Sequence, residues 1–343
     1  MIGRERELMA ISIAIMAKEH CLLVGPPGTA KSLLVEKVCA ASKLRYWRFL
    51  CHKFMTPDDL MGPISMQGLR DDSYRRNLHG IATCDIAFLD EVFKASAAGL
   101  NTLLSVMEER QVFNPNATNI PLLSILAASN ELPQGDDAYL LGALADRLMV
   151  KVIVEPLPAN LWKQLLMYSS DLDNIPVVKP IDNWNDVQFN EQLLDDLVSL
   201  REECEKQAII ISDRRFRKSL KIIHAHAVYH GREYATKKDL MVLRHCWWNT
   251  IEESRKLATF LPVWVNPTGA EIEKLMDEAT NILLACKSSQ KAGKERFAEM
   301  GEALDKTMGI CERLAQLDAP DELAKCQSYQ KEIARLVRTG SHT

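Results

Sequence analysis

The sequence predicts an α/β fold, in which a parallel β-sheet binds a ligand at one edge and an all-α region follows. Three short apolar runs, typical of buried strands, each lead into a glycine-rich or polar stretch, at 21–24, 84–91 and 122–130. In a parallel sheet such strand ends meet at one edge, which is where ligands bind. Beyond residue 155 the apolar residues recur mainly at helical spacing, which predicts helices.

The composition is that of a globular protein of about two domains. The chain has 343 residues, of which 47% are hydrophobic and 26% are charged. Lys and Arg total 42 against 46 Asp and Glu, a formal net charge of -4, which disfavours a nucleic-acid motor because such a protein is expected to be basic.

Nine scattered cysteines without a CxxC pair indicate reduced thiols and a cytoplasmic protein. The apolar run at 8–17 is too short to span a bilayer and leads directly into the first strand. We therefore expect a buried helix there and no membrane segment.

Residues 25–32, "GPPGTAKS", nearly match the phosphate loop G-x-x-x-x-G-K-[ST], with alanine in place of the second glycine. A strand before the loop and a helix after it would direct backbone N–H groups and a helix N-terminus at an anion. We expect Gly25 and Gly28 to allow the turn. We expect Ala30 to have near-helical dihedrals, at which a methyl group costs little free energy.

Lys31 can then reach the β- and γ-phosphates of a nucleotide, and the Ser32 hydroxyl can bind Mg²⁺. The degraded motif alone does not separate this site from an ordinary turn of small residues. The two later strand ends decide between them.

The run at 84–91, "CDIAFLDE", ends in Asp90, which can complete the Mg²⁺ shell, and Glu91, which can polarise the attacking water. The run at 122–130, "LLSILAASN", ends in Asn130, which can orient the same water unless it only forms a turn. Together the three strand ends predict a nucleotide site.

Two further positions can supply a cation to the γ-phosphate. Arg147 directly precedes another apolar strand, and Arg214 and Arg215 lie in the first turn of a helix that Ser212 caps. Spacing alone does not distinguish these side chains from surface arginines.

These elements make the sequence resemble the AAA+ ATPases, more narrowly the MoxR family and its RavA-like subgroup. The resemblance covers about residues 1–255. The stretches that carry it are "GPPGTAKS", "FMTPDDLMGPIS" (54–65), "FLDEVFKASAAGLNTLLSVMEERQVF" (88–113), "AASNELP" (127–133), "ALADRLMVKV" (143–152) and "SDRRFRKSLKIIHAHA" (212–227).

The resemblance implies a role for each candidate residue. Lys31 and Ser32 would be the Walker A residues, Asp90 and Glu91 the Walker B pair, and Asn130 sensor 1. Arg147 would be an arginine finger for the neighbouring subunit, and Arg214, or alternatively Arg215, sensor 2. The nucleotide would contact the backbone of Ile2 and Gly3 at adenine, and along the loop Gly25, Pro26, Pro27, Gly28, Thr29, Ala30, Lys31, Ser32 and Leu33.

Members of the family also carry two inserted hairpins, which here correspond to residues 62–80 and 110–122. In related ATPases such hairpins face a central pore. The tip residues Arg75, Arg76 and His79 could meet a client there, or could form an ordinary solvated loop.

We expect an ATPase domain at 1–155, an all-α lid at 156–255 with a connector at 171–189, and a helical extension at 256–343. Lid helices are expected near 190–207, 213–229 and 236–255, and three amphipathic helices in the extension should pack together. RavA-like proteins also carry a small β-rich module, and no strand-rich insertion is seen here.

The function implied is Mg²⁺-dependent ATP hydrolysis by a ring, expected to be a hexamer, that remodels a protein client like a chaperone. The implied partner contains a von Willebrand factor A domain. Two alternatives stay open: a ring motor stimulated by nucleic acid, and a nucleotide-gated scaffold with little turnover. The client and the pathway are not determined by the sequence.

Overall fold

The computed structural model describes residues 1–133, 136–167, 175–182, 189–288 and 293–339. These residues form two compact units, Met1–Leu257 and Ala258–Thr343. Each unit is described by itself below. In the described ranges no helix is both long enough and apolar enough to pass through a bilayer.

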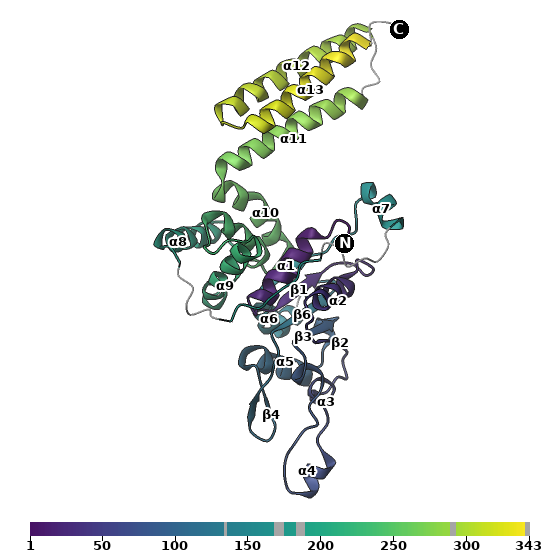
Figure 1. Cartoon of the computed structure of the whole chain (residues 1–343), viewed down its shortest axis with the longest axis vertical. Coiled ribbons are helices and arrows are strands. Elements are labelled where there is room, and N and C mark those ends of the chain that lie inside the picture. Colours follow the sequence, from purple (N-terminus) through teal and green to yellow (C-terminus); the bar gives the residue numbers. More distant parts are fainter. Residues whose placement is uncertain (134–135, 168–174, 183–188, 289–292, 340–343) are drawn as a thin grey trace. The chain divides into compact units, whose positions relative to one another are not determined.

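A five-stranded parallel sheet forms the centre of the first unit, in the order β2-β3-β6-β1-β7 (Figure 1). Its strands are β1 (Cys21–Val24), β2 (Tyr46–Leu50), β3 (Ile86–Asp90), β6 (Ser124–Ser129) and β7 (Val150–Ile153). β1 lies between β6 and β7, with Leu22 opposite Ala127 and Lys151. The predicted parallel α/β sheet is confirmed, and every strand end named above lies at its carboxyl edge.

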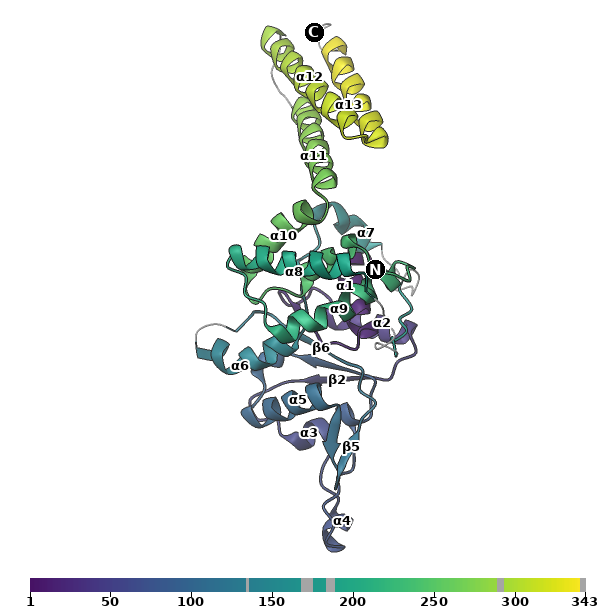
Figure 2. The same ribbon diagram turned by 90° about the vertical axis from the view of Figure 1, so that its left-hand side faces the viewer.

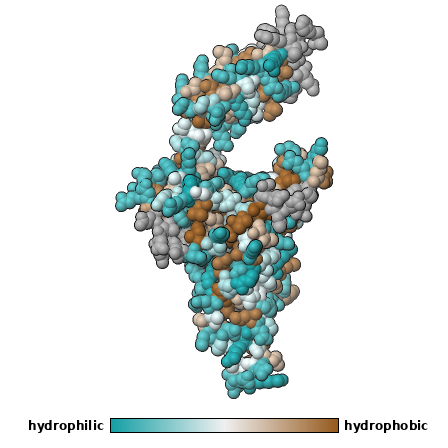
Figure 3. Space-filling view, viewed as in Figure 1, coloured by the Kyte–Doolittle hydropathy of each residue, from teal (hydrophilic) through white to brown (hydrophobic). Residues whose placement is uncertain are grey.

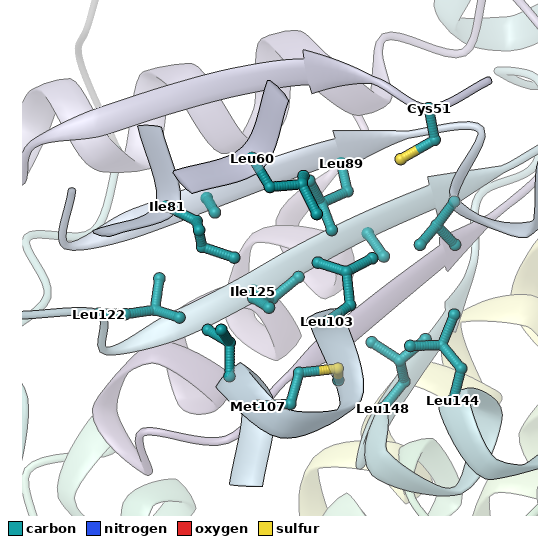
Figure 4. Close-up of a cluster of buried hydrophobic side chains, with 14 of the residues drawn as sticks. Cys51, Leu60, Ile81, Leu89, Leu103, Met107, Leu122, Ile125, Leu144 and Leu148 are labelled. Atoms are coloured by element: carbon teal, nitrogen blue, oxygen red, sulfur yellow. The ribbon is translucent and has the colours of Figure 1, made fainter. Parts of the chain in front are cut away.

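Helices cover both faces of this sheet and bury its apolar residues. The four main ones are α1 (Glu5–Met16), α2 (Lys31–Ala41), α5 (Ala97–Glu109) and α6 (Asp136–Arg147). Figure 4 shows Leu103 and Met107 of α5 and Leu144 of α6 against Leu89 and Ile125 of the sheet. The expected buried helix at 8–17 is confirmed, because the apolar side chains of α1 are almost fully buried.

The two inserts extend from the same end of the first unit, beyond α3 (Pro57–Met61) and α5 (Figure 2). Residues 110–122 form the expected hairpin, from β4 (Gln111–Phe113) and β5 (Ala117–Asn119). In the other insert the Ser65 amide bonds the Arg75 carbonyl at 2.7 Å, so the stem pairs as expected. Its tip is helix α4 (Met66–Arg70) instead of a turn between strands, because the Ser65 side chain caps that helix.

The lid contains α8 (Glu191–Lys206) and α9 (Asp213–Tyr229), close to the expected ranges. The expected single helix at 236–255 is wrong. Instead a 3-10 segment, η5 (Lys237–His245), is followed by an irregular turn and then α10 (Ile251–Val265). The reason is tertiary: the Trp248 carbonyl accepts hydrogen bonds from two buried side chains instead of continuing a helix.

The segment between β7 and α8 is only partly described. It begins with η3 (Ala159–Leu161) and α7 (Trp162–Leu166). Of the expected connector, residues 171–174 and 183–188 lie outside the described residues, and 175–182 has no regular secondary structure.

The second unit consists of α11 (Pro267–Ser288), α12 (Gly293–Gln316) and α13 (Pro320–Thr339), after the end of α10. Ala279, Leu314 and Cys326, one from each helix, are fully buried in a shared apolar core. The expected three-helix packing is confirmed. All nine cysteines of the chain are free and buried.

Candidate functional site

The structure brings together polar groups from three strand ends. Lys31 begins α2 after the loop that follows β1, Glu91 follows β3, and Asn130 follows β6. Lys31 Nζ donates to Asn130 Oδ1 at 3.3 Å, and Asn130 Nδ2 donates to Glu91 Oε1 at 2.5 Å. Lys31, Asn130 and Glu91, which were predicted to lie at one edge of the sheet, are therefore linked by consecutive hydrogen bonds.

Lys31 folds back over the loop that precedes it. Its ammonium donates to the Gly25 carbonyl at 2.6 Å and to the Pro26 carbonyl at 3.0 Å. Burial lowers the pKa of Lys31, and the carboxylates of Asp90 and Glu91 oppose that shift. A phosphate group entering the loop would replace neutral carbonyls with a charged acceptor, which makes a stronger hydrogen bond.

The glycines of the loop are required for two different reasons. A Cβ atom at Gly25 would lie 2.1 Å from the Val154 carbonyl oxygen, so the backbones pass too close for any side chain. Gly28 has φ +81, a conformation that other residues rarely adopt. Both glycines were expected to allow the turn, and only Gly28 does so through a positive φ, whereas Gly25 is required by the close approach of Val154.

Ala30 differs from the expectation of near-helical dihedrals. It adopts φ +63 and ψ 28, in the left-handed region, directly before α2 begins. In that region the Cβ atom costs about 1–2 kcal/mol relative to glycine. The alanine is thus accommodated with strain, at the position where the phosphate-loop motif has glycine.

We expect Ala30→Gly to leave stability unchanged or raise it by up to about 1.5 kcal/mol. The substitution relieves about 1–2 kcal/mol of strain in the folded state. It also lowers the free energy of unfolding by about 0.4–1 kcal/mol, because glycine gives the unfolded chain more conformational freedom. Ala40→Gly, the same substitution at an exposed helical position of α2, should instead lower stability by about 1 kcal/mol. Denaturant midpoints measure both. Equal losses in the two variants would contradict the role of strain at Ala30.

Asp90 and Glu91 each have a cationic neighbour that sequence reasoning missed. Arg48 of β2 forms an ion pair with Asp90 Oδ2 at 2.9 Å, and Lys94 lies 3.4 Å from Glu91. Arg48 could have been found only from the pairing of β2 with β3. Ser32 and Asp90 offer the oxygen ligands that Mg²⁺ prefers, and Mg²⁺ commonly takes few protein ligands beside phosphate oxygens and water.

An apolar cavity of about 390 Å³ lies beside the loop. From the loop and the start of α2 it is lined by Pro26, Pro27, Gly28, Thr29, Ala30 and Leu33. Ile2 lines it as well, whereas Gly3 lies against Leu157 and Leu161, which would lie 3.1 and 2.6 Å from an added Cβ. A flat heteroaromatic base suits such a cavity beside a phosphate site.

The far wall of this cavity was not predicted. It is formed by Leu157, Trp162 and Leu165, which follow β7, and the indole N–H of Trp162 donates to the Leu157 carbonyl at 2.9 Å. Apolar side chains gather over α7 (Figure 3). Only the short apolar pattern "LPANLW" signals this wall in the sequence.

The candidate cations Arg147 and Arg214 lie together, but away from Lys31. Each is 3.7 Å from Glu108 Oε2, Arg147 through Nε and Arg214 through a terminal nitrogen. Arg147 ends α6 shortly before β7, and Glu108 follows Met107, whose carbonyl contacts His20, the residue before β1. These groups therefore lie at the amino edge of the sheet, separated from the loop by the strand length of roughly 10–13 Å.

Arg215 is buried and lies next to Asp146 instead of the nucleotide loop. Its guanidinium forms an ion pair with Asp146 Oδ1 at 3.2 Å and donates to the Ala145 carbonyl at 2.9 Å. Burial lowers the pKa of Arg215. Of the two candidates for a phosphate contact, Arg214 is thus the more accessible side chain.

Comparisons with known proteins agree with this fold. A family model described as the MoxR domain in the MoxR-vWA-beta-propeller ternary systems matches residues 1–188, and an AAA lid domain matches residues 192–261. An uncharacterized protein of Methanocaldococcus jannaschii is 37% identical over 271 residues, which is 75% of this chain and 70% of the relative.

More distant similarities extend to a chaperone and to a crystal structure. Chaperone MoxR1 of Mycobacterium tuberculosis is 28% identical over 158 residues, 45% of this chain and 41% of that protein. The crystal structure of a protein from Cytophaga hutchinsonii, provisionally named an ATPase, has a TM-score of 0.56 and 22% identity. The superposed region covers 74% of this chain and 85% of the chain from Cytophaga hutchinsonii, and the similarity supports the fold described above.

Proposed function

The chain belongs to the MoxR family of AAA+ ATPases, and we propose that it hydrolyses ATP with Mg²⁺ at the carboxyl edge of its sheet. The observation that carries this proposal is the hydrogen-bonded chain from Lys31 through Asn130 to Glu91. This chain supports the proposal because it would supply a cation for phosphate, a carboxylate for water and an amide between them, directly after loop residues that line the apolar cavity.

Each of these groups has a part in the proposed reaction. Lys31 would bind the β- and γ-phosphates, and Glu91 would take a proton from the attacking water while Asn130 holds its carboxylate in place. Ser32 and Asp90 would hold Mg²⁺, which supplies charge neutralisation on the phosphates when bound. The loop and the cavity would hold the rest of the nucleotide.

The proposed site is shared between subunits of a ring. Arg147 and Arg214 lie at the edge of the sheet opposite to Lys31, and this separation supports an action on the nucleotide of a neighbouring copy instead of their own. An arginine that reaches the γ-phosphate stabilises the charge of the transition state. We propose that the ring is a hexamer and that Arg214 contributes as sensor 2 beside the Arg147 finger.

We further propose a protein partner with a von Willebrand factor A domain and a chaperone-like action on a protein client. The matched family model describes MoxR domains from systems that contain such a vWA component, and one relative is named a chaperone. The RavA-like placement within the family stays a prediction. Client contact through the two inserts is a proposal of the same kind.

The test of this proposal is steady-state ATP hydrolysis with and without Mg²⁺, followed by titration with DNA, RNA and salt. We expect Mg²⁺-dependent turnover that nucleic acid does not stimulate. Salt-sensitive stimulation by DNA or RNA would instead favour the ring motor on nucleic acid. Absence of ATP binding would overturn the proposal.

Trp162→Ala is expected to weaken ATP and ADP binding by about 5- to 150-fold, because a base stacked on an aromatic ring gains about 1–3 kcal/mol. The KM for ATP should rise while kcat stays unchanged, since the phosphates and the water are held elsewhere. Trp162→Phe should preserve affinity. Leu166→Ala is the control, because Leu166 is exposed and does not line the cavity. Equal affinity of wild type and Trp162→Ala for ADP would exclude this wall from base binding.

A further inference from the structure

The lid is fixed to the last turn of α6, the turn that carries Arg147. Ser212, the N-cap of α9, donates its hydroxyl to Asp146 Oδ1 at 3.1 Å. Arg215, in the first turn of α9, donates to the carbonyls of Ala145 at 2.9 Å and Asp146 at 3.4 Å. The two residues that directly precede Arg147 are therefore both held by the lid.

These contacts satisfy groups that a helix leaves without internal partners. The last four carbonyls of an α-helix have no intrahelical donor, and those of Ala145 and Asp146 are among them because α6 ends at Arg147. The planar guanidinium of Arg215 has five donors in a fixed geometry, so one side chain can hold several carbonyls at once. The end of α6 is thus set by a side chain from a different part of the chain.

Arg215 is itself held from the opposite side. Its other terminal nitrogen donates to the carbonyls of Cys246 at 3.4 Å and Trp248 at 3.2 Å. The buried Lys151 of β7 donates to the same Trp248 carbonyl at 2.9 Å. Arg215 therefore joins the end of α6, the start of α9 and the turn after η5 into one rigid assembly.

Arg147 has no comparable support of its own. Its side chain donates to the Ala143 carbonyl of its own helix at 3.0 Å and lies 3.7 Å from Glu108. Its Nε atom has no hydrogen-bond acceptor among the described residues. The position of the Arg147 side chain is consequently governed by the backbone of the helical turn below it, which Arg215 fixes.

We infer that Arg215 is the positioning residue for the arginine finger: it sets where Arg147 is presented to the nucleotide of a neighbouring copy of this chain. This inference rests on the proposed function. It makes the finger part of the lid assembly, so that a movement of the lid carries Arg147 with it. Arg215 touches no nucleotide in this arrangement, unlike the sensor role considered for it from the sequence.

The test uses mixed assemblies of full-length subunits. Lys31→Ala subunits are expected to bind no nucleotide but to present an intact finger, whereas Arg147→Ala subunits bind ATP but present none. Each variant alone should be inactive, and mixing should restore hydrolysis where the two meet. If mixing these two variants restores no hydrolysis although Arg215 is intact, the proposed ATPase with a shared site is wrong. That result would count against the proposed function and not against the contacts of Arg215, so the two failures can be told apart.

Arg215→Met is then introduced into the Lys31→Ala subunits. We expect the restored hydrolysis to fall by about 10- to 100-fold, since a misplacement of about 1 Å has an effect of this size. Arg215→Lys should recover part of it, because an ammonium reaches fewer of the carbonyls. Undiminished restoration by the Arg215→Met subunits would overturn the inference.

Two further measurements separate positioning from general damage. In an otherwise wild-type chain, Arg215→Met should lower kcat but leave the affinity for a fluorescent ADP within about twofold, because it affects a transition-state contact of the next site. Arg217→Met, at an exposed position of α9, should change neither quantity. If Arg215→Met does not fold, Arg215→Lys, which keeps the charge but reaches fewer of the carbonyls, should reduce kcat in the same direction by a smaller factor. A loss of ADP affinity equal to the loss of kcat would overturn the inference.

Discussion

Replacement of Glu91 by glutamine is expected to lower ATP hydrolysis by at least about 100-fold, the lower end of what a positioned general base contributes. The substituted side chain keeps an oxygen that can accept the hydrogen bond from Asn130 Nδ2. It loses the ability to take a proton from water. Binding of ATP should therefore persist while its cleavage is lost, because Lys31 and the loop are unaffected.

The measurement for Glu91→Gln is retention of radiolabelled ATP on the isolated protein, together with single-turnover hydrolysis. In wild type the bound nucleotide should convert to ADP, and in the variant it should remain ATP. Glu109→Gln is a matched control, because Glu109 is an exposed glutamate at the end of α5. If wild type itself retains uncleaved ATP and Glu91→Gln changes nothing, the nucleotide-gated scaffold replaces the ATPase proposal.

Much of the carboxyl edge of the sheet could be predicted from sequence because its geometry follows from strand topology. A buried strand with a polar end places that end at the sheet edge wherever the neighbouring strands lie in parallel. Glu91 and Asn130 directly follow such strands, and Lys31 follows β1 after the loop at 25–30, so their common edge could be predicted although their hydrogen bonds could not. Long apolar periodicity in the extension predicted its helices for a similar reason.

Other features depended on contacts between segments far apart in the chain. The irregular turn at Trp248 forms because the Trp248 carbonyl accepts hydrogen bonds from Lys151 and Arg215 instead of from a helical N–H group. Neither partner lies near Trp248 in the sequence. The left-handed conformation of Ala30 reverses the usual preference of alanine, so local propensity gives the wrong answer there. Trp162 closes the apolar cavity only because the chain after β7 returns to the loop.

The separation between Lys31 and Arg147 implies that the proposed catalysis requires assembly of several subunits. Lys31 begins the helix that follows β1, whereas Arg147 ends the helix that precedes β7, so the two residues lie at opposite edges of the sheet in which β1 and β7 pair in parallel. The proposed finger of one chain is therefore too far from the proposed phosphate site of the same chain to complete it. Catalysis should therefore depend on how many subunits have neighbours.

Arg147→Ala is expected to lower kcat by about 1,000-fold or more in the assembled protein, the effect typical of an arginine finger. The physical reason is that the proposed finger would stabilise the charge that develops on the neighbouring subunit's γ-phosphate during transfer. Affinity for ADP should be little changed, because the proposed contact of Arg147 is with the γ-phosphate, which ADP lacks. Lys31→Ala, in contrast, should lose nucleotide binding itself.

Specific activity measured against protein concentration distinguishes a shared site from an isolated one. For wild type the activity per subunit should rise with concentration until assembly is complete, whereas Arg147→Ala should stay low throughout. Arg217→Ala is the control, since it removes an exposed arginine from the same unit without touching either site. If activity per subunit is constant and Arg147→Ala matches wild type, Arg147 is not the finger and the shared site fails. Arg214 would then be the accessible arginine to test next, because it lies against the same carboxylate of Glu108.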